Sequence, residues 1–359
     1  MGAIDCMPPM IRGLDILEEE SLQYAVNFVE FRKTGRIRSG IVPIVGIMAP
    51  PDCNYSCVYC IYGNSPSKSS EGLTNEEIER LLNEAAILGA KTIEIAGSGE
   101  PTIWKGLPHL VDEAAKKNLR VVVFTNGAVI ANNDGLMRML FESGASVIIK
   151  FNSFKDDVQN FLCGHNRAHE WRDKSLQKAL EIGFNREMPT RLGIESVITT
   201  MNINEISQLW HFARERNICP FFESLHLGGP LFKTIARLNP SYEELKELFA
   251  TVAMEDKVRW GYKWEPELPY IGFPCTVYDH VLVNYDGKVS PCFEFGSRLG
   301  NVREKSLVEI LRGSEMLGRI RELRLAKRGT MMCRDAEGGN QQVISAREIT
   351  DMKPRQKTR

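Results

Sequence analysis

The stretch IVPIVGIMAPPDCNYSCVYC, residues 41–60, joins a run rich in Ile and Val to three closely spaced cysteines. The apolar run over 41–49 predicts a buried β-strand. Cys53, Cys57 and Cys60 then follow in the spacing C-x3-C-x2-C. Three thiolates in this spacing can bind three irons of a four-iron cluster and leave the fourth iron without a protein ligand, so a small molecule can bind there.

Further along the chain, short β-rich runs alternate with segments of helical periodicity in six such units. This alternation predicts an α/β protein with a parallel sheet covered by helices. The helix after the first strand is well marked, because Thr74 and Glu77 form a capping box ahead of an apolar stripe. Parallel sheets place their chemistry at the carboxyl ends of strands, so the cysteine loop lies where an active site is expected. The predicted strands are 41–49, 91–97, 119–126, 146–152, 191–200 and 220–227.

The segments outside these units complete the predicted organisation. Apolar residues recur at helical spacing over 14–34, typical of an amphipathic helix, and 239–257 also favours a helix. Residues 278–295 alternate apolar and polar side chains about Asp286 and Gly287, which predicts a β-hairpin. We therefore expect a helical extension over 1–40, a catalytic core over 41–260, a small α+β module over 261–338 and a mobile tail over 339–359.

The composition is that of a soluble globular protein, with 43% hydrophobic and 25% charged residues and a net charge of -1. A nucleic-acid partner is not expected, because such proteins usually carry a basic excess. The sequence has no apolar run long enough to span a membrane and no signal-peptide pattern, so we expect a cytoplasmic protein without membrane contact. Nine cysteines in a reducing compartment favour metal or redox chemistry over disulfides.

The cysteine spacing, with Tyr59 directly before the third cysteine, resembles the defining motif of the radical S-adenosylmethionine (SAM) superfamily. In that family the three thiolates hold a [4Fe-4S] cluster whose open iron binds the amino and carboxylate groups of SAM. Reductive cleavage of SAM then gives a 5′-deoxyadenosyl radical that abstracts hydrogen from a substrate. The resemblance implies that Tyr59 flanks the adenine and that a flavodoxin- or ferredoxin-type protein donates the electron. A structural zinc site is the alternative, although zinc usually takes four nitrogen or sulfur ligands.

Two later motifs stand in the order typical of the family. The first resembles its glycine-rich SAM-amine motif GGEP, with a serine as the departure, and comprises Gly97, Ser98, Gly99, Glu100 and Pro101. Glycines let the backbone approach a ligand closely, and a carboxylate can orient an ammonium group. The second, Thr125 and Asn126 before Gly127, resembles the TNG turn of the family. Together with the strands, these motifs imply a partial (β/α)6 barrel of the TIM type.

Polar residues near the ends of the last three core strands are further candidates. Lys150 and Asn152 share one face of the fourth strand, where relatives contact the ribose and carboxylate of SAM; rim solvation is the equal alternative. Glu195 and Thr199, followed by Asn202, either line the cavity or close the barrel. In the sixth strand, Glu223 and His226 can orient polar groups of a substrate.

A second cysteine set resembles the SPASM/twitch domain, which binds auxiliary iron-sulfur clusters. Cys275, Gly287 and Cys292 reproduce its opening pattern, C-x9-15-G-x4-C, and Cys333 would supply a third ligand. A twitch domain usually has four cysteines for one cluster. Three alternatives stay open: Asp335 completes the set, one iron is left open for substrate, or the site binds nothing. We expect a second [4Fe-4S] cluster.

Two cysteines stand outside both sets. A solitary cysteine such as Cys163 or Cys219 is usually a small buried hydrophobe. A thiol facing the barrel interior can also give a hydrogen atom to a product radical, so both are candidate catalytic hydrogen donors.

These inferences predict a radical SAM enzyme that acts on a small polar metabolite of the sugar, cyclitol or nucleoside type by dehydrogenation, epimerisation or elimination. The substrate class rests on analogy with twitch-type relatives. One alternative is a maturase that modifies a ribosomally made peptide. Another is a non-catalytic iron-sulfur or zinc protein, which would release no 5′-deoxyadenosine from SAM.

Overall fold

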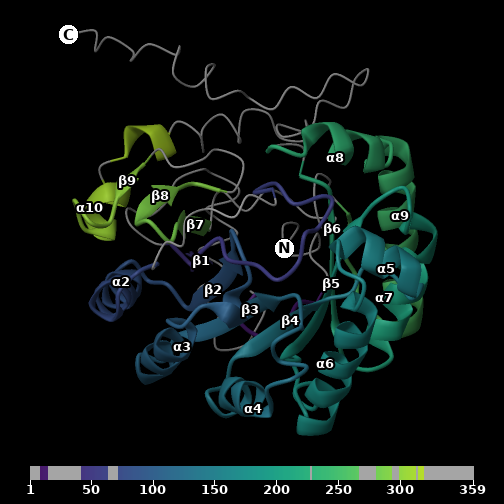
Figure 1. Cartoon of the computed structure of the whole chain (residues 1–359), viewed down its shortest axis with the longest axis horizontal. Coiled ribbons are helices and arrows are strands. Elements are labelled where there is room, and N and C mark those ends of the chain that lie inside the picture. The colour runs from purple at the N-terminus through teal and green to yellow at the C-terminus, as the bar shows by residue number, and fades with distance from the viewer. Residues whose placement is uncertain are drawn as a thin grey trace, which may run out of the picture.

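The computed structural model describes residues 9–14, 42–63, 72–226, 229–266, 280–292, 299–312 and 314–318. All six predicted core strands are confirmed, and each pairs in parallel with its neighbour in chain order. The sheet curves as a partial (β/α)6 barrel, with helices on its outer side (Figure 1). The strands are β1 (Ile44–Ala49), β2 (Thr92–Gly97), β3 (Arg120–Thr125), β4 (Ser146–Lys150), β5 (Leu192–Ile198) and β6 (Cys219–Ser224).

The helices bury one apolar face each against this sheet, as their periodicity predicts. The predicted capping box is present at the start of α2, where Thr74 and Glu77 exchange side-chain hydrogen bonds with each other's backbone. The helices that follow the strands are α2 (Asn75–Ile87), α3 (Leu107–Lys116), α4 (Asp134–Glu142), α5 (Asp156–Cys163), α6 (Ala168–Ile182), α7 (Ile206–Arg214), α8 (Phe232–Leu238) and α9 (Tyr242–Glu255).

The predicted hairpin extends the sheet of the barrel. β7 (His280–Val283) pairs in parallel with β1, and β8 (Lys288–Ser290) and β9 (Gly300–Asn301) follow in antiparallel fashion. Gly287 forms the turn with a positive φ of 84°. The short helix α10 (Leu307–Arg312) packs on α2, where the backbone N–H of Leu307 donates to Glu84 at 2.6 Å. The C-terminal module is therefore joined to the core through β1 and α2.

Residues 9–14 close the amino-end side of the barrel. Met10, Ile11 and Leu14 pack against side chains from β3, β4 and β6, among them Cys219. The side chains of Thr92 and Ser146, at the starts of β2 and β4, donate to the carbonyls of this segment at 2.6 and 2.8 Å. This segment therefore covers the side of the barrel opposite the carboxyl ends of the strands.

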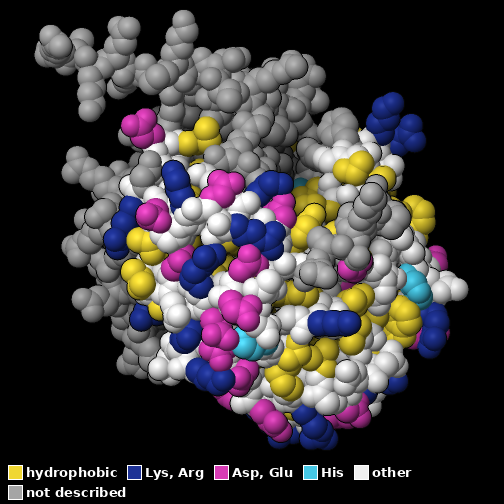
Figure 2. All heavy atoms as spheres, turned by 60° about the vertical axis from the view of Figure 1, so that its left-hand side comes forward, with side chains coloured by type: hydrophobic (Ala, Val, Ile, Leu, Met, Phe, Trp, Pro, Cys, Tyr) yellow, Lys and Arg dark blue, Asp and Glu magenta, His cyan; other side chains and the backbone are white. Residues whose placement is uncertain are grey.

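Several predictions lie outside the described residues. These are the helix over 14–34 beyond its first residue, the tail over 339–359, Cys275, Cys333 and Asp335. Within the described residues, no helix is long and apolar enough to cross a membrane. On the face turned forward in Figure 2, Lys and Arg are interspersed with Asp and Glu rather than gathered into a basic surface.

Candidate active site

A cavity of about 410 Å³ opens at the carboxyl ends of the core strands. Its wall includes the cysteine loop after β1, the GSGEP turn after β2, the TNG turn after β3 and the ends of β4, β5 and β6. Apart from Asn152, every SAM-site residue predicted above lines this cavity, and so do the three cysteines of the first motif. Chain segments up to about 170 residues apart in sequence therefore meet at one site, as the parallel topology requires.

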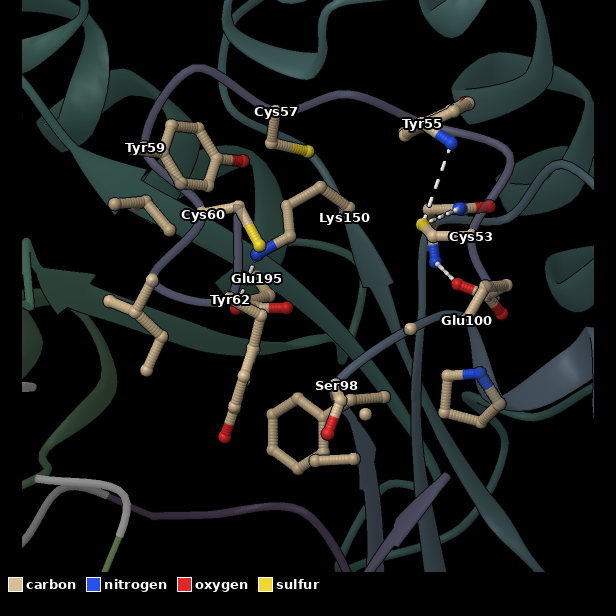
Figure 3. A pocket seen from close by; sticks show the side chains of 18 of the residues that line it. Cys53, Tyr55, Cys57, Tyr59, Cys60, Tyr62, Ser98, Glu100, Lys150 and Glu195 are labelled. Carbon is tan, nitrogen blue, oxygen red and sulfur yellow. Dashed lines mark hydrogen bonds and ion pairs between the residues drawn. The ribbon is translucent and has the colours of Figure 1, made fainter. Parts of the chain in front are cut away.

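The cysteine loop is held against the end of α5. Ser56 and Val58 donate backbone hydrogen bonds to the carbonyls of Cys163 and Leu162 at 3.2 and 3.1 Å. Gly164 caps α5 with a φ of 61°, and a Cβ there would lie 2.0 Å from the Ser56 carbonyl oxygen. The contact needs glycine, because only glycine lets the two backbones approach this closely. The sulfurs of the three cysteines turn toward the space that the loop encloses (Figure 3).

This thiol set fits a [4Fe-4S] cluster better than a zinc ion. Within the described ranges, no three Cys, His, Asp or Glu side chains converge closely enough to hold a single metal ion. In a cubane each thiolate binds a different iron, so convergence on one point is not required. Burial raises the pKa of Cys53 to about 12 and also raises the pKa of Cys60. Iron binding would reverse this by stabilising the thiolates.

Glu100 joins the GSGEP turn to the TNG turn. Its carboxylate is buried and accepts hydrogen bonds from the Thr125 hydroxyl at 2.6 Å and the Asn126 backbone N–H at 2.8 Å, besides two from Thr102. Burial raises the pKa of Glu100, and these hydrogen bonds oppose the rise. The carboxylate therefore positions two turns, and its predicted contact with an ammonium group stays a prediction.

The two turns also position the cysteine loop. The side chain of Asn126 donates to Asn54 at 2.7 Å, and its nitrogen lies 4.0 Å from the sulfur of Cys53. The backbone N–H of Glu100 donates to the carbonyl of Asp52 at 2.8 Å. A Cβ on Gly99 would lie 2.2 Å from that same carbonyl oxygen, so the position needs glycine.

Asn152 lies behind the cavity wall. It is fully buried, and its amide donates to the hydroxyl of Tyr59 at 2.8 Å and accepts from the backbone N–H of Val197 at 3.0 Å. Tyr59 itself lines the cavity, as predicted. The structure thus gives Asn152 neither of its two predicted roles, direct ligand contact or rim solvation, and makes it a support for Tyr59.

Charged residues from three strands meet in the cavity. Lys150 forms an ion pair with Glu195, and His226 lies 3.6 Å from Glu223, measured between Nε2 and Oε2. Burial, together with the charge of Glu223, raises the pKa of Glu195 to about 7. Thr199 and Asn202 instead bond to each other beyond the end of β5, so they close the barrel rather than line the cavity.

The structure does not support Cys163 or Cys219 as hydrogen donors. Cys163 is fully buried behind Cys57, and its sulfur accepts hydrogen bonds from Gln159 at 3.4 Å and Asn152 at 3.5 Å. Cys219 begins β6, at the opposite end of the barrel, and packs against Met10 and Ile11. Neither is among the described residues that line the cavity. The place of Cys219 directly before the predicted strand 220–227 already indicated the amino end of the barrel.

Sequence reasoning missed Glu94, which also lines the cavity. Its carboxylate lies 3.8 Å from Nε2 of His280 on β7. A Cβ on Gly46, in the strand between them, would lie 2.7 Å from that nitrogen, so the glycine leaves room for the histidine. The alternation of KTIEIAG places Glu94 on the same strand face as Ala96 and was the available signal.

Comparison with known families agrees with this geometry. The family described as the Radical SAM superfamily matches residues 48–213, and the family described as an iron-sulfur cluster-binding domain, SPASM, matches residues 275–335. The first match covers the cysteine loop and the following core strands as far as α7. The second begins at Cys275. These matches imply a [4Fe-4S] cluster and SAM in the core and further iron-sulfur binding in the C-terminal module.

Similar proteins include a GTP 3′,8-cyclase from Crocosphaera subtropica, 30% identical over 58% of this chain, a match that spans 63% of the cyclase. A PqqA peptide cyclase from Bradyrhizobium diazoefficiens is 24% identical over 75% of this chain and 72% of its own length. The crystal structure of Streptococcus suis SuiB bound to S-adenosylmethionine has the same fold, with a TM-score of 0.63, 19% identity and coverage of 84% of this chain and 72% of SuiB. The chain therefore belongs to the radical SAM superfamily and carries a C-terminal SPASM/twitch iron-sulfur domain.

Proposed function

We propose that this enzyme cleaves SAM reductively in the cavity at the carboxyl ends of the core strands and abstracts a hydrogen atom from a substrate bound beside it. The observation that carries the proposal is the joining of three motifs around one space. The cysteine loop, the GSGEP turn and the TNG turn all line the cavity, and Glu100 and Asn126 bond them together. A three-cysteine metal loop without catalysis would not need this cavity.

Different residues of the cavity wall would bind the cluster and SAM. Cys53, Cys57 and Cys60 would hold the cluster, which when bound supplies the electron that splits SAM. Tyr59 offers an aromatic face beside the loop, and Gly97, Ser98 and Gly99 line the cavity. A Cβ on Gly97 or Gly99 would lie 1.9 or 2.2 Å from a backbone carbonyl oxygen, so the tight turn needs both glycines. We propose that Lys150, which lines the cavity and pairs with Glu195, meets a carboxylate or a ribose hydroxyl of SAM.

In the SPASM domain we propose Cys275, Cys292 and Cys333 as cluster ligands, with the fourth position open or filled by Asp335. The match to that domain over 275–335 includes all four residues. Cys292 lies two residues beyond the end of β8, and β7, the partner of β8, pairs with β1, the strand that leads into Cys53. The β7–β8 hairpin that ends near Cys292 is thus joined to the strand that precedes the cysteine loop.

For the substrate we propose a small polar metabolite that binds beside SAM in this cavity. Modification of a peptide is the second candidate, favoured by the match to a PqqA peptide cyclase over 75% of this chain. A flavodoxin- or ferredoxin-type protein is the proposed electron donor. A cytoplasmic location would keep the free thiols reduced.

The proposal is tested by anaerobic reconstitution, followed by incubation with dithionite and SAM. We expect roughly eight irons per chain for two cubanes and 5′-deoxyadenosine as a product. Electron paramagnetic resonance (EPR) spectra of the reduced protein should change when SAM is added, because SAM would bind the open iron. An iron-loaded protein that gives neither the spectral change nor 5′-deoxyadenosine would favour the non-catalytic alternative.

A further inference from the structure

Arg303 of the C-terminal module binds the helix that follows the cysteine loop. It comes shortly after β9, and its guanidinium donates to both carboxylate oxygens of Glu77 on α2, at 2.6 and 3.1 Å. The same guanidinium donates to the backbone carbonyl of Gly72 at 3.1 Å. A planar guanidinium that binds a carboxylate through two N–H groups fixes direction as well as distance. Arg303 therefore holds the C-terminal module and the start of α2 in one relative position.

Both partners of Arg303 have a second role in the core. Glu77 belongs to the capping box of α2, where its carboxylate also accepts the backbone N–H of Thr74 at 2.9 Å. Gly72 has a φ of 78°, and a Cβ there would lie 2.9 Å from Cγ of Pro50 and 3.0 Å from Nε1 of Trp104. The backbone of Gly72 is therefore packed tightly against these two side chains.

Pro50 and Trp104 each border a loop of the proposed SAM site. Pro50 is buried directly after β1 and stands three residues before Cys53. Trp104 is also buried and ends the single helical turn that begins after Glu100. Close-packed contacts transmit a displacement because they leave little free space. A shift of Gly72 would therefore disturb the side chains that support the cysteine loop and the GSGEP turn.

The hairpin of the C-terminal module positions Arg303. Its guanidinium donates to the carbonyl of Asp286 at 3.3 Å, in the turn between β7 and β8. A Cβ on Gly287 would lie 3.2 Å from Cγ of Arg303, so the glycine leaves room for the arginine. Gly287 is also the glycine of the SPASM pattern that ends at Cys292. The hairpin that leads to a proposed cluster ligand thus also holds the arginine.

We propose that Arg303 is a positioning residue of the SAM site, which transmits the order of the C-terminal hairpin to the cysteine loop through Glu77 and Gly72. Arg303 is not among the described residues that line the cavity, so it would act through Gly72 rather than through contact with SAM. A ligand binds best when the loops around it are already in place. The inference rests on the proposed function, because the position of these loops matters only if the cavity binds SAM.

The test compares two arginines that join the same parts of the chain. The side chain of Arg303 is 42% exposed, and that of Arg80 on α2 is 49% exposed. Arg80 donates to the carbonyl of Val302 at 2.6 Å. Both Arg303→Met and Arg80→Met remove a link between α2 and the C-terminal module. The Arg80 link runs through Val302, so its loss leaves the bond between Arg303 and Gly72 in place.

SAM affinity is measured on the full-length, anaerobically reconstituted proteins, by EPR titration of the reduced cluster with SAM. For Arg303→Met we expect the dissociation constant of SAM to rise by roughly threefold or more at unchanged iron content, an effect of the size found for residues that do not touch a ligand. For Arg80→Met we expect a dissociation constant close to that of the native protein. A native value for Arg303→Met, or an equal rise in both variants, overturns the proposal.

Arg303→Lys keeps the test decisive if Arg303→Met does not fold. A lysine retains the charge beside Glu77, but its ammonium group lacks the fork that binds Glu77 and Gly72 together. We expect Arg303→Lys to unfold in urea near the midpoint of Arg80→Met and still to bind SAM more weakly. Unchanged SAM affinity in Arg303→Lys contradicts the proposal. Formation of 5′-deoxyadenosine by the native protein is measured in the same series, so normal SAM cleavage with unaltered affinity in the variants overturns the positioning role alone.

Discussion

The carboxylate of Glu100 accepts a hydrogen bond from the backbone N–H of Asn126 at 2.8 Å, across 26 residues of sequence. The same carboxylate accepts from the hydroxyl of Thr125, and Asn126 in turn bonds the cysteine loop through Asn54. One buried acidic side chain therefore fixes the relative position of three loops that line the cavity. Positioning of this kind is what a site for an ordered ligand needs.

Glu100→Gln should weaken this arrangement. The amide presents an NH2 group to at least one of the present donors and leaves that donor unsatisfied, at a cost of about 1–3 kcal/mol. We expect lower stability in denaturant titrations and weaker SAM binding by equilibrium dialysis of the reconstituted protein. Glu79→Gln on the exposed face of α2 is the control, since its side chain is 49% exposed. Equal SAM affinity in both variants would remove the positioning role.

Variants of Asn152 and Tyr59 should distinguish a residue that stabilises the cavity wall from a residue that contacts SAM. Asn152→Ala leaves the Val197 N–H and the Tyr59 hydroxyl without their present partner, so we expect a loss of about 2–4 kcal/mol in unfolding free energy. Tyr59→Phe keeps the ring in the cavity wall and should cost about 1 kcal/mol with SAM affinity nearly unchanged. A larger loss for Tyr59→Phe than for Asn152→Ala in denaturant titrations would contradict this division.

Substitution of Asp256 should lower the free energy of unfolding strongly. It is fully buried, pairs with Arg214 at 3.0 Å and accepts hydrogen bonds from the indoles of Trp210 and Trp264. Asp256→Asn leaves the buried guanidinium without a counter-charge, at a cost of about 3–5 kcal/mol. The neighbouring Glu255→Gln loses a partly exposed pair with His211 and should cost under about 1 kcal/mol. Both variants are compared by urea titration. Equal losses of unfolding free energy would contradict the view that burial makes the Asp256 ion pair the stronger contribution.

Gly13 should be required for residues 9–14 to pack against the amino-end side of the barrel. Its φ is 98°, and a Cβ there would lie 2.9 Å from Cγ2 of Val122. Gly13→Ala is expected to cost about 2 kcal/mol or more, because steric contact adds to the backbone cost. Gly144→Ala isolates the backbone cost, since Gly144 has a φ of 78° and no atom within 4 Å of an added Cβ. The melting temperature of Gly13→Ala should be lower than that of Gly144→Ala. The reverse order would refute a steric role of the Gly13 position.

Local patterns predicted the strands, the first capping box and the hairpin because these depend on residues close in sequence. The cysteine loop and its two partner turns were also found, since each motif is contiguous and a parallel sheet brings strand ends together. The pairing of β7 with β1 was not predicted, because no local signal in HVLV specifies a partner more than 230 residues away.

The errors within the site have different physical origins. Cys163 and Asn152 were taken as candidates for the cavity, yet both are fully buried, and each is within hydrogen-bonding distance of the other. Glu94 was overlooked, although its approach to His280 across Gly46 places it in the wall. For Asn152, periodicity gives the face of the strand, but depth behind the wall depends on neighbours from other strands. Cys163 ends helix α5, where strand alternation gives no information, and the signal for Glu94 was present in the sequence but not used.

The central claim is that Cys53, Cys57 and Cys60 support SAM cleavage in this cavity. Its most direct test is the yield of 5′-deoxyadenosine per chain after anaerobic incubation with dithionite and SAM, compared between the native protein and Cys57→Ser. We predict product from the native protein and none above background from Cys57→Ser, with the C-terminal iron content retained. Equal product from both proteins, or none from a fully iron-loaded native protein, would contradict the account.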